Sequence, residues 1–231
     1  MKKLFAFIFA AVFSLSLANA QEVFQGTLKY DFKFVGEGLE GFEAMLPKGM
    51  EMSVLKKDLL VQIKGGMTEM MMGRVLTKGK EGVSYMIKDS EETIYVMDPS
   101  KMEEDETAEE AKPTVTKEDE TLEIAGYKCQ KYRVEMEANG TQVTQYVWVT
   151  KDFKFPEMKG GGMSSGMGSS MRIDGLDGVP LKSMFTQGPM TVTMTATTVD
   201  TNAPNKKAFK LPKKYDKQDF DMNSMMGGMG M

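Results

Sequence analysis

Histidine is absent from the 231-residue chain, which also has only one cysteine, Cys129, and one tryptophan, Trp148. A Ser-His-Asp hydrolase needs an imidazole to accept the serine proton near neutral pH, so this mechanism is excluded. Histidine is also the commonest ligand for zinc and other transition metals, and a thiolate cluster needs several cysteines. We therefore expect no zinc site, no intramolecular disulfide and no cofactor, and we interpret Cys129 as a small buried strand residue.

Long apolar segments are scarce as well. The main apolar run covers residues 4–13, about half of the ~20 residues that a membrane-spanning helix needs. It follows two lysines and precedes Ala18-Asn19-Ala20, an order that is typical of a secretory signal peptide. We expect export into the periplasm or the medium with cleavage after Ala20, and no transmembrane segment in the exported chain.

Positive charge is in deficit in the expected exported chain. Residues 1–20 carry two of the 29 basic residues and none of the 33 acidic ones, so their removal leaves 27 basic residues and a net charge of −6. Nucleic acids and anionic membrane surfaces bind proteins through basic faces that release counterions. The charge balance therefore argues against nucleic acid as a partner.

Alternation of apolar and polar residues is the main pattern in the rest of the chain. Leu28, Tyr30, Phe32 and Phe34 alternate with polar residues, as in a half-buried strand. Similar segments, separated by turn residues such as Asn139-Gly140, give roughly eight to ten short strands. A short helix is expected at residues 39–46. The fold class predicted from this pattern is mainly β, with a curved antiparallel sheet, a closed barrel or a sandwich as the candidate architectures.

Composition divides the exported chain into a single β-rich domain, residues 21–215, and a flexible Met/Gly-rich tail, residues 216–231. Residues 100–120 are strongly acidic and have few apolar members, which is typical of a solvated spacer loop. Residues 157–178 are rich in glycine and methionine and are expected to form a second loop.

Four short segments form a recognisable set: Ile124–Cys129, Val147–Lys151, Val179–Lys182 and Phe209–Pro212. This set resembles an exported bacterial family known as domain of unknown function 4412, which is also methionine-rich. The resemblance implies a fold similar to the LolA/LolB lipoprotein carriers, with a strongly curved antiparallel sheet that forms a half-open barrel. It also implies one or two short helices that plug the apolar concavity. It implies no particular activity.

The segment from Gly162 to Gly166 matches the G-x-S-x-G pattern of a hydrolase nucleophile elbow. That elbow needs a strand before it, a helix after it and a histidine elsewhere in the chain. Here glycines precede the segment, more Gly and Ser follow it, and histidine is absent, so we interpret the match as accidental. We expect the protein not to be an enzyme.

Methionine clusters offer the remaining metal chemistry, because thioether sulfur suits Cu(I). Two clusters lie in Gly-rich segments, where spacings of mostly three to five residues could bring several sulfurs to one ion: Met163, Met167 and Met171, and Met222, Met225, Met226 and Met229. A neighbouring residue, Met158, and a separate group at residues 67–72 share this bias. The competing interpretation is that these side chains are adaptable fillers against apolar surface.

The expected function is binding of a lipid, an acyl chain or a lipidated protein in an apolar concave face. The residues predicted to contact such a ligand are aromatic and lie on expected strands: Tyr30, Phe32, Phe34, Tyr146 and Trp148. Core packing is the alternative role for the tryptophan. Two other functions stay open, namely Cu(I) binding through the methionines and a structural or envelope-stress role without a small ligand. The oligomeric state is not predicted.

Overall fold

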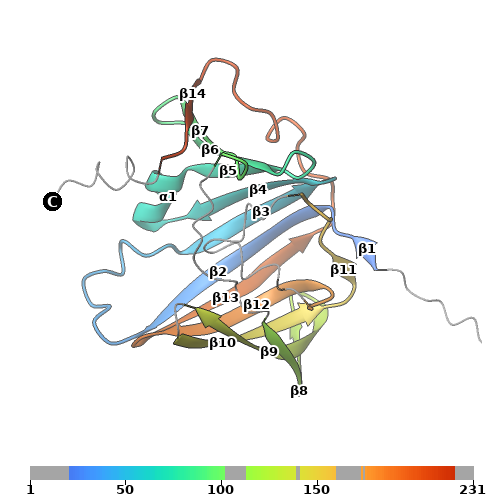
Figure 1. The fold of residues 1–231 in the computed structure, drawn as a ribbon. Coiled ribbons are helices and arrows are strands. Elements are labelled where there is room, and N and C mark those ends of the chain that lie inside the picture. The colour runs from blue at the N-terminus through green and yellow to red at the C-terminus, as the bar shows by residue number, and fades with distance from the viewer. Residues whose placement is uncertain (1–20, 102–112, 139–140, 160–172, 174, 222–231) are drawn as a thin grey trace, which may run out of the picture.

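The structure, a computed structural model, describes residues 21–101, 113–138, 141–159, 173 and 175–221 (Figure 1). Strands dominate these residues, and one 12-stranded sheet has the order β14-β7-β6-β5-β4-β3-β2-β13-β12-β10-β9-β8. A separate parallel pair consists of β1 (Glu22–Val23) and β11 (Phe153–Lys154). The predicted mainly β fold is confirmed.

The first half of the sheet is an antiparallel meander in chain order. Its strands alternate apolar and polar residues, and short turns join most of them, including those at 56–57 and 79–82. The bounds are β2 Gly26–Gly36, β3 Gly49–Leu55, β4 Asp58–Lys64, β5 Arg74–Lys78, β6 Val83–Lys88 and β7 Thr93–Met97.

The second half starts at the far edge of the sheet and returns to the first half. Its strands are β8 Thr114–Ile124, β9 Tyr127–Ala138, β10 Thr141–Thr150, β12 Val179–Gln187 and β13 Met190–Asp200. The turn between β8 and β9 is Ala125-Gly126, and both residues have positive φ, as tight two-residue hairpins require. Strand β13 then pairs with β2, which joins the two meanders into one sheet.

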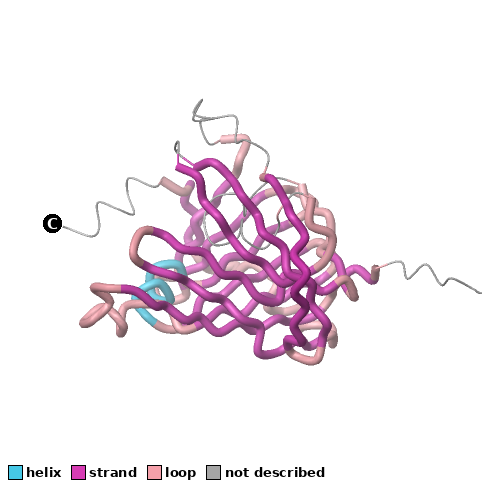
Figure 2. The backbone as a smooth tube through the Cα atoms, turned by 90° about the horizontal axis from the view of Figure 1, so that it is seen from below, coloured by secondary structure: helices cyan, strands magenta, loops and turns pink. Residues whose placement is uncertain are grey.

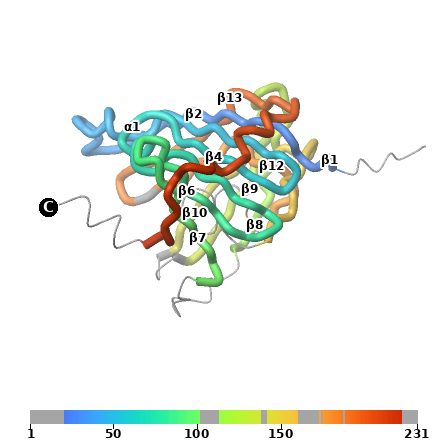
Figure 3. Tube along the Cα trace, turned by 90° about the horizontal axis from the view of Figure 1, so that it is seen from above, coloured from blue at the N-terminus to red at the C-terminus, as the bar shows by residue number. Residues whose placement is uncertain are grey.

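The sheet is strongly curved and open. Strands β8 and β13 are not hydrogen-bonded neighbours, yet they lie in contact. The view from below shows the strands winding round (Figure 2), and the view from above places β2 and β13 on one side of the molecule and β7 and β8 on the other (Figure 3). The edge strands, β8 and β14 (Asp216–Asp219), do not pair with each other. The predicted curved antiparallel sheet is therefore confirmed, and the closed barrel and the sandwich are wrong.

Both edges carry features that discourage pairing with another chain. The register of β8 against β9 shifts between Lys117 and Thr121, and charged residues crowd this irregular stretch. Strand β14 is four residues long, fully exposed and largely charged. Bulges, charges and short edge strands are common devices against edge-to-edge aggregation.

Three apolar clusters hold the described residues together. The largest packs Leu28, Met52, Val179 and Met194 with the aromatic rings of Phe24 and Phe153. A second consists of Leu76, Ile87 and Ile94 under Phe209. A third places Ile173 over Val134, Val147 and Val149. Segments outside the sheet thus cover parts of it, although they are not the helices that the resemblance implied.

Three local predictions need correction. No helix forms at residues 39–46, which make turns, and the short helix lies instead at α1 (Gly66–Met72), none of whose residues is buried. The spacer expected at 100–120 is shorter, because β8 begins at Thr114, and residues 102–112 lie outside the described residues. Residues 216–219, expected to belong to a flexible tail, instead form β14 beside β7.

Candidate functional site

The five aromatic residues predicted to contact a ligand fall into two groups. Directly opposite residues on paired strands share a face of the sheet. Phe32 and Phe34 lie opposite Met194 and Val192, whereas Tyr146 and Trp148 lie opposite Met184 and Lys182. Along the regular part of the pairing through β12 and β13 these two sets are one residue out of step, but the register of β10 against β12 shifts at Trp148. Tyr146 and Trp148 accordingly pack in the same apolar cluster as Tyr30 and Phe32.

Tyr30 is part of the core. Its side chain is 2% exposed, and its hydroxyl donates a 2.8 Å hydrogen bond to the carbonyl of Pro180. Burial raises the pKa of Tyr30 well above its usual value, and the Cys129 thiol nearby adds to this effect. Burial likewise raises the pKa of Cys129 to about 11, so this thiol stays neutral and unreactive, in accordance with its predicted role. Both residues stabilise the fold.

Phe32 and Phe34 lead out of this core along β2. Phe32 packs against the largest apolar cluster, and the rings of Phe32 and Phe34 meet edge to face with centroids 6.4 Å apart. Phe34 is only partly buried and lines an open groove of about 610 Å³ together with Val35, Leu39 and three glutamates, Glu37, Glu40 and Glu43. The apolar face of β2 therefore continues from the core into an accessible groove.

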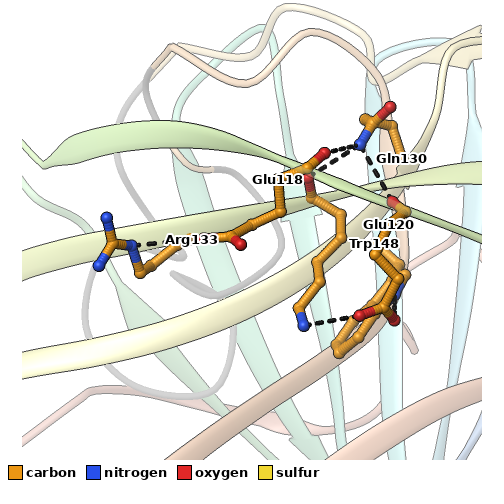
Figure 4. Close-up of polar contacts among 6 residues, drawn as sticks. Glu118, Glu120, Gln130, Arg133 and Trp148 are labelled. Carbon is orange, nitrogen blue, oxygen red and sulfur yellow. Dashed lines mark hydrogen bonds and ion pairs between the residues drawn. The ribbon is translucent and has the colours of Figure 1, made fainter.

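The second aromatic group is enclosed by charged side chains. Nζ of Lys182 lies 4.4 Å and Nζ of Lys131 5.1 Å from the Trp148 ring centroid, which are cation–π distances. The indole N–H donates a 3.0 Å hydrogen bond to Glu120, whose carboxylate also pairs with Lys131 at 2.8 Å (Figure 4). Trp148 is 4% exposed. Its polar and cationic contacts are already satisfied within the chain, so we interpret it as a packing residue.

The position of Glu120 depends on the irregular stretch of β8. The side-chain amide of Gln130 donates hydrogen bonds to the carbonyls of Glu118 and Glu120, which stand where the ladder to β9 is interrupted (Figure 4). The Arg133 guanidinium lies 3.5 Å from the Glu118 carboxylate and 3.7 Å from that of Glu135. This network fixes the charged cover over Trp148, and within it Nε of Arg133 is buried without a hydrogen-bond partner.

Near the groove at the end of β2 lie exposed apolar side chains, of which the sequence patterns had singled out only the methionines at 67–72. The 37–48 connection between β2 and β3 meets the start of α1, where the amide of Met67 donates a 3.0 Å hydrogen bond to the carbonyl of Met45. We call the exposed apolar residues of this region the end surface: Val35, Phe42, Met45, Met67 and Met70. Phe42 is 58% and Met70 73% exposed. The sequence signal was the run of glutamates interleaved with apolar residues at 37–46.

The methionines of the Cu(I) hypothesis cannot be placed. Residues 160–172 and 222–231 lie outside the described residues, and with them lie the two Gly-rich clusters and the G-x-S-x-G match. Of the neighbouring methionines, Met158 and Met72 pack against the largest apolar cluster, where thioethers serve as filler. In the described part of the chain, no group of three or more Cys, Asp or Glu side chains is arranged to hold a metal ion. Cu(I) binding stays a prediction.

Comparison with known proteins identifies the family of this chain. A family model described as "Domain of unknown function (DUF4412)" matches residues 43–215. The chain belongs to this family. No curated protein matches the sequence. Among solved structures, LprF from Mycobacterium bovis aligns with a TM-score of 0.33 and 8% identity, over 78% of this chain and 89% of LprF.

The family segments lie at fold-determining positions. Ala125-Gly126 makes the β8–β9 turn, residues 147–150 are buried throughout, and Pro180 accepts the Tyr30 hydrogen bond. Phe209 covers the cluster on β5–β7. None of these segments lines the groove at the end of β2. Within the described ranges, no helix is long and apolar enough to cross a membrane.

Proposed function

We propose that this DUF4412 protein is an exported, non-enzymatic binding protein that holds an apolar group, such as an acyl chain, in the groove at the end of β2. One observation carries the proposal. The aromatic face of β2 runs from buried Tyr30 through Phe32 to Phe34, where it opens into the groove. An apolar chain bound there would extend the core by contact with Phe34 and Leu39, and burial of apolar area supplies the affinity.

The ordered start of the chain supports export with cleavage after Ala20. Strand β1 begins at Glu22 and pairs with β11, and Phe24 is buried against Phe153 and Phe155. The first described core contacts thus lie a few residues after the expected cleavage site. Mass spectrometry of protein from the periplasm or medium should show a mature form that begins at Gln21.

Binding of a fluorescent fatty acid tests the proposed function. We expect saturable uptake by the protein, and a loss of affinity of about fivefold in Phe34→Ala, because roughly 1 kcal/mol of apolar contact is removed. Tyr146→Ala is the matched control, since it truncates a partly buried aromatic residue on another strand that does not line the groove, and it should leave the affinity unchanged. Absence of uptake, or equal losses in the two variants, would refute the groove as the binding site.

A further inference from the structure

The end surface concentrates most of the exposed apolar area of the described residues. Among the described residues, seven large apolar side chains are strongly exposed. Five of them form the end surface, and the other two are Val23 and Leu122. The surface is continuous because α1 starts directly against the 37–48 connection: a side chain at Gly66 would collide with the carbonyls of Met45 and Leu46. Such concentrations on a soluble domain mark interaction sites.

The charge beside the end surface is acidic and unpaired. Residues 36–46 contain three glutamates and no basic residue. Glu37, Glu40 and Glu43 all line the groove, and none of them has an ion pair or hydrogen bond within the described part of the chain. Glu69 of α1 differs, because its carboxylate accepts the Gly65 N–H at 2.7 Å.

Basic residues do not neutralise this region. Lys48 is the first basic residue after the run, and the stem of its side chain lies against Gly65. Lys33 precedes the groove on the opposite, polar face of β2. The groove thus combines an apolar floor at Phe34 and Leu39 with a negatively charged rim.

We propose that the end surface and its groove form a docking site for a protein segment that carries apolar and basic side chains. This rests on the proposed function and identifies its ligand as a polypeptide partner. Carboxylates at the rim oppose an anionic lipid surface and attract lysine or arginine. Exposed phenylalanine and methionine fit apolar side chains of varied shape, as at many protein interfaces.

Short fluorescein-labelled peptides of equal length test this proposal by fluorescence polarisation on the mature protein. One alternates leucine with lysine, one leucine with glutamate and one leucine with serine. We expect the lysine peptide to bind at least about tenfold tighter than the glutamate peptide, with a preference that declines towards about 0.5 M salt. The triple variant Glu37→Gln, Glu40→Gln, Glu43→Gln should abolish this preference.

Two matched controls separate the rim from general effects of charge and exposure. The triple variant Glu22→Gln, Asp119→Asn, Glu123→Gln removes the same charge from exposed positions outside the groove and should keep the preference. Phe42→Ser with Met70→Ser should weaken binding of the lysine and serine peptides, whereas Leu122→Ser should not. Circular dichroism of each variant verifies that the sheet is intact.

The outcomes distinguish this inference from the proposed function. Equal affinity for the three peptides, or tighter binding to vesicles of anionic phospholipid than to the lysine peptide, overturns the inference. Peptides that fail to bind while the fluorescent fatty acid is still taken up overturn the inference and leave the proposed function standing. Failure of both kinds of ligand overturns both.

Discussion

Two apolar surfaces of this sheet differ in how far the rest of the described chain covers them. On β5–β7, Leu76, Ile87 and Ile94 are completely buried because residues 208–215 pack over them. At the end surface, Phe42 and Met70 stay mostly exposed, and no described segment covers them. A large open sheet presents more apolar area than its own chain covers. The difference identifies the place where another molecule can supply the missing cover.

Specific polar contacts hold the covering segment on β5–β7. Nζ of Lys78 donates to the carbonyl of Phe209 at 2.9 Å and pairs with Asp58 at 2.6 Å. The hydroxyl of Tyr215 donates to Asp89 at 3.0 Å, and β14 continues the segment as a parallel neighbour of β7. The end surface has no comparable anchor in the described residues. Among the residues that the structure describes, no segment is directed to it.

The largest effect should separate these two surfaces directly. Phe209→Ala removes a buried ring from the cover over Leu76 and Ile87 and should reduce the free energy of unfolding by about 3–5 kcal/mol. Phe42→Ala removes an equally large but exposed ring and should change it by less than about 0.5 kcal/mol. Urea denaturation followed by circular dichroism measures both. Similar losses in the two variants would show that the end surface is covered within the chain.

A smaller effect is expected at the buried end of β2. Tyr30→Phe keeps the ring but leaves the Pro180 carbonyl without its hydrogen bond, at a cost of about 1–3 kcal/mol in the free energy of unfolding. Phe34, at the open end of the same strand, is only partly buried. Phe34→Ala should therefore lower the free energy of unfolding by less than Phe209→Ala does. If Tyr30→Phe proved neutral, the hydroxyl would contribute no net stability.

The buried thiol predicts the response of the same core to alkali. Burial raises the pKa of Cys129 from 9.0 to about 11, so the unfolded chain loses this proton first as the pH rises. The contribution of the neutral thiol to the free energy of unfolding is complete below pH 9. About 1 kcal/mol of it is lost by pH 10, and the loss continues as the pH approaches 11. Cys129→Ala should lose correspondingly less stability than the wild type between pH 7 and 10. Parallel pH profiles in urea denaturation would contradict this.

The alternation of apolar and polar residues predicted most of the strands. It failed where glycine conformation or contacts between distant residues determine the local structure. The alternation from Leu28 to Phe34 identified β2, because a half-buried strand imposes period 2. The helix expected at 39–46 fails because Gly38 and Gly41 take positive φ. The real helix, α1, lies among methionines that we had considered as metal ligands. Its N-terminal end depends on contact with Met45, far away in sequence.

The predicted ligand contacts stay a prediction, and the sequence could not supply the whole set of residues around the groove. Phe34 lies in the groove, but Val35 and Phe42 were missed, since apolar residues in a glutamate-rich turn carry no periodic signal. The face shared by Tyr146 and Trp148 depends on the register of β10 against β12 and of β13 against β2. Register of strands distant in sequence cannot be deduced from one strand's alternation.

Trp148 represents a third kind of cover, in which charged side chains add to packing against the apolar cluster, and its response should be the smallest. Hydrogen bonds from Lys131 and Trp148 lower the pKa of Glu120 below its usual 4.5. The carboxylate therefore stays ionised, and the cover intact, until the pH falls below 4.5. The fluorescence of this single tryptophan should stay constant from pH 7 to that point and change only below it. Glu120→Gln should abolish the transition, whereas Glu118→Gln, which changes a side chain without contact to the indole, should preserve it. If the transition persists in Glu120→Gln, the emission reports loss of the sheet and not loss of the contact between Glu120 and the indole. The charged cover over Trp148 would then be lost only when the sheet unfolds, like the anchored segment on β5–β7.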